Sequence, residues 1–264
     1  MKRLPSSRIA VSCLAALSGL AAPAAVRAAE PSFSLGVGAE YTTGDYGGDA
    51  SVDEVYVPVT AIYDASRVSF RLTVPFLSVR APEGTVIEGP DGQPIVGEGP
   101  RTTESGLGDI VAAATVFDVL RSSTGDVALD LTGKVKFGTA DEDKGLGTGE
   151  QDYTLQADLF RFYDRFTAIG TAGYTFRGDP EGVNLNDAFF ASLGGTYAVS
   201  STVRAGAFYD YREASYPGND DIHEASVFAS TRVADAWRLQ GYLLAGFTDS
   251  SPEWGIGLTA TRRF

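Results

Sequence analysis

Charged residues recur at alternate positions in several short stretches of this chain. Lys134 and Lys136 follow Asp130, and Arg212 follows two residues after Asp210. Alternate residues of a β-strand point to the same side, so each of these sets shares one face. Buried charges of both signs must pair with one another or hold water. We therefore predict a polar interior surface that could contact a solute, with the candidates Arg71, Asp109, Asp130, Lys134, Lys136, Asp158, Arg204, Asp210, Arg212, Glu224, Arg232 and Arg238.

Few of the remaining side chains could act in catalysis. His223 is the single histidine, and a serine–histidine hydrolase would need it as the general base. Ser226 lies three residues further along the same stretch and therefore points to the opposite face. We predict no catalytic residue, no enzyme activity and no cofactor.

A metal site is not expected in the acidic loop over residues 141–152. Asp141 and Asp143 have the spacing of a calcium-binding loop, but Gly145 stands at a ligand position and Leu146 stands where such a loop needs glycine. We predict a solvated acidic loop. Its carboxylates could still bridge lipopolysaccharide phosphates through divalent cations.

Short amphipathic strands are the elements that position these residues. In the last stretch, Trp254, Ile256 and Leu258 alternate with small or polar residues, and the sequence finishes on Phe264. Such alternation is typical of a strand with one apolar and one polar face. The pattern occurs twelve times, over residues 33–42, 55–63, 68–76, 106–117, 127–137, 153–162, 166–177, 187–199, 202–213, 223–233, 236–247 and 253–264.

Long and short connections alternate between these twelve segments. An even number of strands, short turns at one end and longer loops at the other are typical of outer-membrane β-barrels. We predict an all-β fold, a closed antiparallel transmembrane β-barrel of about twelve strands with up-and-down topology and both ends of the barrel domain in the periplasm. A final amphipathic strand ending in Phe264 resembles the signal that the barrel-assembly machinery reads, so Phe264 is predicted to act in assembly.

The aromatic residues on the apolar faces support the barrel. Phe76 and Trp254 lie near the long loops, Phe33 and Phe264 lie near the short turns, and aliphatic residues lie between them. Two aromatic girdles around an aliphatic band are expected where rings sit at both lipid interfaces. A soluble β-sandwich would scatter its aromatic residues over both faces.

Residues 1–28 have the features of a secretory signal peptide, which leaves residues 29–264 as one barrel domain in the Gram-negative outer membrane. Lys2 and Arg3 precede an apolar run, and Val26-Arg27-Ala28 offers a cleavage site. Cys13 lies in this leader, so the exported chain has no cysteine for a disulfide or a thiolate metal site. Of the 21 basic residues four lie in the leader, so 17 remain against 34 acidic ones, a net charge of −17. This charge argues against nucleic-acid binding.

Two states of the interior are consistent with the sequence. A barrel of eight strands is filled by its own side chains, and a barrel of sixteen strands leaves an open channel. A barrel of twelve strands falls between these two cases. The inward charges could pair and plug the lumen, or they could line a water-filled passage. Inward small residues such as Gly206 and Gly257 favour some free space. The long segment over residues 81–104 either folds inward and constricts the pore or forms a surface hairpin.

Pro58 and Pro75 interrupt two neighbouring strand segments on their inward faces. Proline lacks the N–H that a sheet needs, and it is normally confined to edges and bulges. A turn centred between Ala65 and Ser66 would pair Pro58 with Thr73 and make the two prolines diagonal neighbours. They predict either a bulge that bends the wall or a gap between these two strands, through which an apolar ligand could leave sideways into the membrane.

Two glycine-rich stretches carry a family resemblance. Residues 105–110 read S-G-L-G-D-I, and residues 147–153, about forty positions later, read G-T-G-E-Q-D-Y. Together with the strand pattern they resemble the outer-membrane barrels named for the meta-pathway of phenol degradation, over most of the exported chain. The resemblance implies transport of small molecules, aromatic or hydrophobic ones included, and identifies no site residue. At the loop-side ends of their strands, Asp109 and Asp152 could tie down the strand starts, line the mouth or stabilise turns.

The sequence thus predicts an outer-membrane channel or transporter for passive passage of small molecules. The alternative is a non-conducting barrel with a structural or surface-adhesion role. Expected partners are outer-membrane lipid and lipopolysaccharide, the barrel-assembly machinery and a small-molecule substrate.

Overall fold

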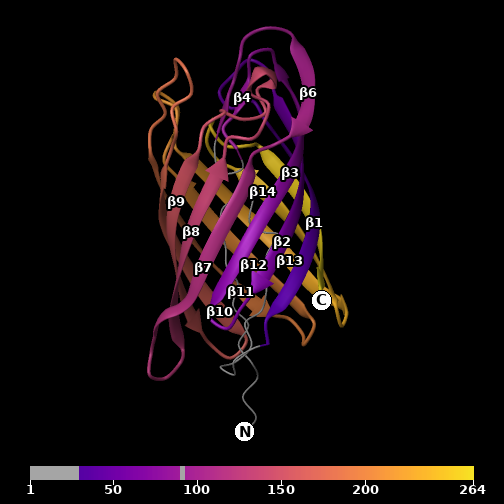
Figure 1. The fold of residues 1–264 in the computed structure, drawn as a ribbon, viewed down its shortest axis with the longest axis vertical. Coiled ribbons are helices and arrows are strands. Elements are labelled where there is room, and N and C mark those ends of the chain that lie inside the picture. The colour runs from indigo at the N-terminus through magenta and orange to yellow at the C-terminus, as the bar shows by residue number, and fades with distance from the viewer. Residues whose placement is uncertain (1–29, 90–92) are drawn as a thin grey trace.

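The computed structural model describes residues 30–89 and 93–264, and most of them form one closed sheet (Figure 1). The signal peptide predicted over residues 1–28 lies outside the described residues. Within the described part of the chain, no helix is long and apolar enough to cross a membrane.

The wall consists of antiparallel strands that pair with their neighbours along the chain. They are β1 (Ser32–Gly44), β2 (Val52–Asp64), β3 (Val68–Pro82), β6 (Arg101–Leu107), β7 (Ile110–Arg121), β8 (Val127–Phe137), β9 (Asp152–Phe162), β10 (Phe166–Phe176), β11 (Ala188–Ala198), β12 (Val203–Arg212), β13 (Ile222–Ala234), β14 (Trp237–Gly246) and β15 (Trp254–Arg263). β15 pairs with both β14 and β1, which closes the sheet and removes free edges. Since β6 and β7 are successive parts of one strand beside β3, the wall has twelve strands. The predicted closed antiparallel barrel is confirmed.

The strand made of β6 and β7 is longer than the predicted segment over residues 106–117, and it is interrupted. Thr73 pairs with Val111, but Phe76 pairs with Leu107, so three residues of this strand stand opposite two of β3. An extra residue of this kind is a β-bulge, which bends the strand and breaks the ladder. The bulge lies at Gly108 and Asp109, inside the first glycine-rich motif.

The two faces of the wall differ as predicted. Outward leucines such as Leu155 and Leu193 are 64% and 71% exposed, and so continuous an apolar surface fits hydrocarbon rather than water. Phe76 and Trp254 are exposed towards the loop end, and Phe33 and Phe264 towards the turn end. The expected aromatic girdles are therefore present.

The lumen is fuller than its small residues suggested. A cluster of large side chains lies inside the part of the wall formed by β8 to β14, and we call it the lumen aromatic cluster: Ala128, Phe160, Phe162, Ile169, Phe208, Phe228, Tyr242 and Leu244. A Cβ on Gly257 would lie 2.0 Å from Cε1 of Tyr242, and a Cβ on Gly206 would lie 2.5 Å from Cε1 of Phe228. The expectation that these glycines leave free space is wrong, because the ring of a neighbouring strand occupies the space.

The long loops gather at one end of the barrel and the tight turns at the other (Figure 1). β1 begins and β15 ends at the turn end, so the wall closes there. This arrangement agrees with the predicted alternation of short and long connections.

Candidate functional site

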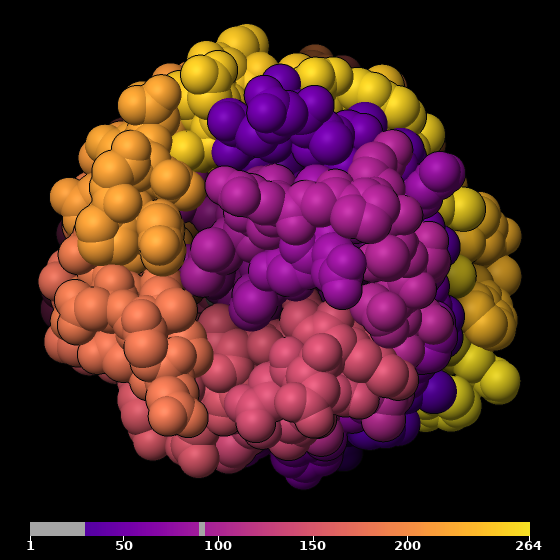
Figure 2. All heavy atoms as spheres, turned by 90° about the horizontal axis from the view of Figure 1, so that it is seen from above, coloured from indigo at the N-terminus to yellow at the C-terminus, as the bar shows by residue number. Residues whose placement is uncertain are grey.

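The segment between β3 and β6 closes the loop end of the barrel. β4 (Val86–Ile87) and β5 (Pro94–Ile95) pair within it, and we call residues 86–89 and 93–95 the plug hairpin. Seen from the loop end, atoms of this segment cover the middle of the ring (Figure 2). Ile87 is only 3% exposed and belongs to an apolar cluster with Tyr56, Leu77 and Leu146. Of the two arrangements left open by the sequence, the inward-folded one is observed.

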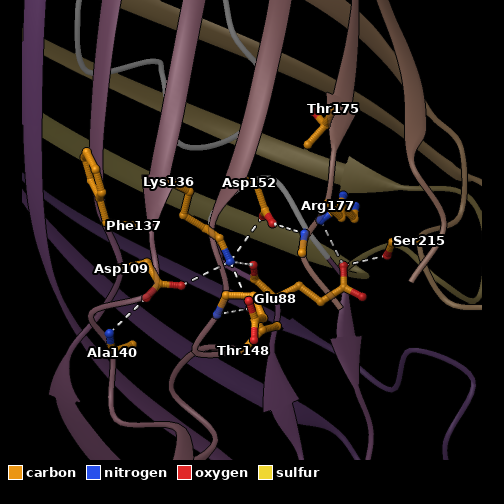
Figure 3. A network of polar contacts seen from close by, with 12 residues as sticks. Glu88, Asp109, Lys136, Phe137, Ala140, Thr148, Asp152, Thr175, Arg177 and Ser215 are labelled. Atoms are coloured by element: carbon orange, nitrogen blue, oxygen red, sulfur yellow. Dashed lines mark hydrogen bonds and ion pairs between the residues drawn. The ribbon is translucent and has the colours of Figure 1, made fainter. Parts of the chain in front are cut away.

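Glu88 anchors the plug hairpin through a buried carboxylate. Its Oε2 accepts hydrogen bonds from Ser215 Oγ at 2.5 Å and from the backbone N–H of Gln93 at 3.1 Å. The same oxygen lies 3.3 Å from Nη1 of Arg177, and both charged side chains are almost fully buried (Figure 3). A buried charge that loses its partner costs several kcal/mol. The ion pair therefore holds the hairpin against the wall at the end of β10.

Lys136 on β8 joins the plug hairpin to the bulge between β6 and β7, to the start of β9 and to the loop before β9. Its Nζ lies 3.3 Å from Oδ2 of Asp109 and 3.2 Å from Oδ2 of Asp152. It also donates hydrogen bonds of 3.1 Å to Thr148 Oγ1 and to the backbone carbonyl of Glu88 (Figure 3). We call these five residues the Lys136 network. One ammonium group thus connects segments that are far apart in the sequence.

The two glycine-rich motifs meet in this network. Asp109 ends the core of the first motif, and its Oδ1 accepts hydrogen bonds of 2.9 Å from the backbone N–H groups of Thr139 and Ala140. Asp152 belongs to the second motif, and its Oδ1 accepts a hydrogen bond of 3.1 Å from the backbone N–H of Gly178. Instead of stabilising turns of their own, the two aspartates hold the loops after β8 and β10 at the mouth.

Of the twelve predicted lumen residues, Asp109, Asp130, Lys136, Asp158, Asp210, Arg212 and Glu224 are buried, Arg71, Lys134, Arg204 and Arg238 are half-buried, and Arg232 is exposed. Only Asp109 and Lys136 belong to the Lys136 network. Of the others, Asp210, Arg212 and Glu224 lie near the loop end, Arg71, Asp130, Lys134 and Asp158 lie further down, and Arg204, Arg232 and Arg238 lie at the turn end. The set is therefore several layers rather than one site.

Sequence reasoning missed the anchors Glu88, Arg177 and Ser215. They lie in loops or just past a strand, where alternation assigns no face. The available signal was local: Glu88 follows two β-branched residues, Val86 and Ile87, in a segment otherwise rich in glycine and proline.

Pro58 and Pro75 stand directly opposite each other, which corrects the predicted diagonal arrangement. The turn is centred one residue later than assumed, between Ser66 and Arg67, because Asp64 pairs with Ser69 and the N–H of Ala65 donates to the carbonyl of Val68. Moving the centre of a hairpin turn by one residue moves every partner on β3 by two positions.

The predicted gap between the two proline-bearing strands is also wrong. Pairing of β2 with β3 is continuous from Asp53 to Asp64. The carbonyl of Pro75 accepts a hydrogen bond of 3.0 Å from Gly108 N–H, and a residue's N–H and C=O point to the same neighbour in an antiparallel sheet. The missing donor of Pro75 therefore faces the bulge between β6 and β7, and that of Pro58 faces β1. Regular pairing lapses at both of these outer places.

His223 and the acidic loop have ordinary structural contacts. Nδ1 of His223 lies 2.7 Å from the hydroxyl of Tyr209. Asp141 caps the short 3₁₀ helix η2 (Glu142–Lys144) by accepting from the backbone N–H of Lys144. Across residues 30–89 and 93–264, no group of three or more His, Cys, Asp or Glu side chains could hold a metal ion.

A closed sheet with an apolar outer belt, aromatic girdles and a polar interior defines the class of outer-membrane β-barrels. The belt and the fold place the protein in the outer membrane of Gram-negative bacteria. The chain belongs to the family described as "Putative MetA-pathway of phenol degradation", whose model matches residues 37–264. This confirms the resemblance carried by the two glycine-rich motifs.

One solved structure shares the fold at low sequence identity, and a second gives a weaker match. The COG4313 outer membrane channel from Pseudomonas putida F1 is 15% identical with a TM-score of 0.66, and the match covers 92% of this chain and 99% of that one. The CymD monoaromatic hydrocarbon channel is 11% identical with a TM-score of 0.46 and 88% of each chain covered. The comparison with curated proteins gives no match.

Proposed function

We propose that the protein is a gated channel for passive passage of small apolar molecules, aromatic ones included, across the outer membrane. The observation that carries the proposal is the plug hairpin, which is folded into the mouth and held there by the buried Glu88–Arg177 ion pair and by the hydrogen bond from Lys136. A barrel with only a structural role has no need to anchor a loop over its own lumen with charges that are costly to bury.

Family and fold support the choice of substrate. The family takes its name from phenol degradation, and the similar solved structures include channels, one of them named for monoaromatic hydrocarbons. The lumen aromatic cluster offers apolar surface to such molecules. Catalysis is not part of the proposal, and the solved structures named above are channels.

Whole-cell uptake tests this function. Cells lacking the gene, complemented with the wild type or with an empty vector, are given a dilute ring-bearing solute such as benzyl alcohol. We expect slower initial uptake with the empty vector. Purified protein in planar bilayers should conduct only in brief openings, and replacing residues 86–95 by a glycine-serine linker should make the openings long-lived.

The rival function is a non-conducting structural or adhesion barrel, and the same measurements separate the two. The channel proposal would be contradicted if both strains took up the solute equally and neither the wild type nor the linker variant conducted in planar bilayers. Surface attachment of the deletion strain would then be the property to measure.

A sideways exit is a second proposed feature of the channel, at a different place from the one predicted. A hollow of about 430 Å³ lies on the outer surface beside β3 and β7. It is lined by lipid-facing Leu72 and Ala112 and also by Arg71 and Ala113 of the inward face. Because pairing lapses next to it at the bulge, an apolar solute could leave there into the membrane. Replacing Pro75 by Val, which restores a donor, should slow uptake of an apolar solute but not of a sugar.

Export and assembly complete the proposal. Residues 1–28 act as a signal peptide, and the outer loops contact lipopolysaccharide. Phe264 is read by the barrel-assembly machinery, and its backbone N–H also donates to the carbonyl of Phe33 at 2.8 Å across the closing seam. Deleting Phe264 should lower the amount of folded barrel in outer-membrane fractions, and normal levels would contradict this role.

A further inference from the structure

A cavity of about 60 Å³ lies directly beneath the plug hairpin. Ile87, Gly89 and Pro94 of the hairpin line one side of it, and side chains of β1, β2, β12 and β13 and of the loops after β1 and β14 line the rest. It lies against the gate proposed above, at the loop end of the lumen.

The charges around this cavity are unbalanced. Glu40, Glu54 and Glu224 line it against the single cation Arg212. Asp210 stands opposite Glu224 on the neighbouring strand and adds to the excess.

Lys136 and the loop tyrosine Tyr46 complete the charged surroundings of the cavity. Lys136 lies behind Gly89, but two carboxylates of its network already pair with it. Burial and the negative charges of Glu54 and Glu224 raise the pKa of the Tyr46 phenol above its ordinary range. Acidic residues therefore outnumber basic ones around the cavity.

Two of these carboxylates have unused acceptors. Glu40 is 7% exposed; its Oε2 accepts from Tyr242 at 3.1 Å, while its Oε1 has no hydrogen-bond partner among the described residues. Glu224 is 2% exposed, and its Oε2 likewise has no partner in the described part of the chain. Buried polar atoms are normally paired, so two free acceptors in one cavity indicate a donor that binds there.

Size and lining restrict that donor. A cavity that holds benzene measures about 150 Å³, so 60 Å³ admits a small head group but no ring while the hairpin is in place. Tyr46 and Tyr56 contribute aromatic surface to the lining, and a cation is attracted to the face of such rings. Tyr46 also has φ of 51°, a conformation rare outside glycine and often found at functional sites.

We propose that this cavity binds the ammonium group of a small primary amine, with Glu40 and Glu224 as the acceptors. The inference rests on the proposed channel function and names one substrate class for it: amines with a slim apolar body. Neutral analogues bind more weakly, and anions are repelled by the excess of carboxylates.

Butylamine, butanol and butyrate test the proposal because they share one chain length and differ in charge. Each is titrated by saturation-transfer NMR into the purified full-length barrel in detergent. Since a hydrogen bond to a charged group is stronger than one between neutral groups, we expect butylamine to bind roughly tenfold more tightly than butanol, and butyrate not to bind. Glu40→Gln and Glu224→Gln should each remove most of the difference.

Asp158→Asn is the matched control, because it removes a buried lumen carboxylate on β9 that does not line the cavity. It should keep the preference for the amine, and heat-modifiable gel mobility shows that each variant is folded. Equal binding of butylamine and butanol to the wild type and to Glu40→Gln would overturn the proposal and mean that the cavity holds only water. That result leaves the uptake of benzyl alcohol untouched, so it is distinct from failure of the channel function.

Discussion

Charged side chains are arranged differently at the two ends of the lumen. At the loop end, Lys136 lies between Asp109 and Asp152, and all three side chains are less than one-tenth exposed. At the turn end, Arg232 is paired directly with Arg238 across β13 and β14, and Arg204 lies on the adjacent strand. Among the residues that the structure describes, no carboxylate forms an ion pair with these three arginines.

The different arrangement of charges indicates which end of the lumen is hydrated. Like charges opposite each other on a sheet repel, and the repulsion is small only in a medium of high dielectric constant. Arg232 is exposed, whereas the Lys136 network is buried. We infer that the turn end, where Arg232 is exposed, is a wet mouth, whereas the loop end is a dry closure that depends on exact pairing.

Removing the central cation should have the largest effect on the closed end. Lys136→Met leaves Asp109 and Asp152 buried without their partner, which typically costs about 3–5 kcal/mol. We expect a drop of that order in the free energy of unfolding in denaturant, together with longer channel openings.

Lys144→Met is the matched control for that variant. Lys144 pairs with Asp141 at 3.6 Å, but both side chains are 46% exposed, so its loss should change stability by no more than about 0.5 kcal/mol. Equal losses in the two variants would show that burial does not distinguish the two ion pairs.

A methyl group inside the lumen should have an intermediate effect. Gly257→Ala places a Cβ 2.0 Å from the ring of Tyr242, and overpacking of this kind costs about 1–3 kcal/mol. Gly133→Ala is the comparison, because nothing lies within 4 Å of its Cβ. Denaturant unfolding should separate the two, and equal stability would mean that the Tyr242 ring moves away without cost.

A change at the wet mouth should have the smallest effect on stability. Arg232→Gln relieves repulsion with Arg238, so stability should rise by about 0.2–1 kcal/mol or stay level. The clearer measurement is the reversal potential in a salt gradient, which should shift towards cation preference. A marked loss of stability would mean that the arginines are not hydrated as inferred.

Alternation alone was sufficient to predict the wall. It assigned residues such as Lys136, Glu224 and Arg238 to the inward face. Alternate residues of a strand share a face, so once the lipid-facing residues are known the inward-facing ones are fixed as well. Alternation could not predict the register of Pro58 and Pro75, because the residues after Asp64 allow the turn to be centred at more than one position. Gly257 was misread for a similar reason: a missing side chain indicates space, but not that a ring of the next strand fills it.

The Lys136 network depends on long-range contacts that the sequence does not encode locally. Its two aspartates were noted through the glycine-rich motifs, and Lys136 was placed inside the lumen. Their convergence required the position of Glu88, which lies in a loop without periodicity. The burial of an acidic residue in an irregular segment such as that of Glu88 can be predicted only once its partner, Arg177, is known to lie across the mouth.

The anchoring of Glu88 also bears on the order of folding. Its partner Ser215 lies 127 residues further along the chain, whereas wall strands other than the closing pair β1 and β15 meet their neighbours across a single connection. Contacts of such sequence separation form late, since the loop between them must close first. The mouth therefore seals only after β12 and the loop that follows it are in place, and before that step the loop end is open.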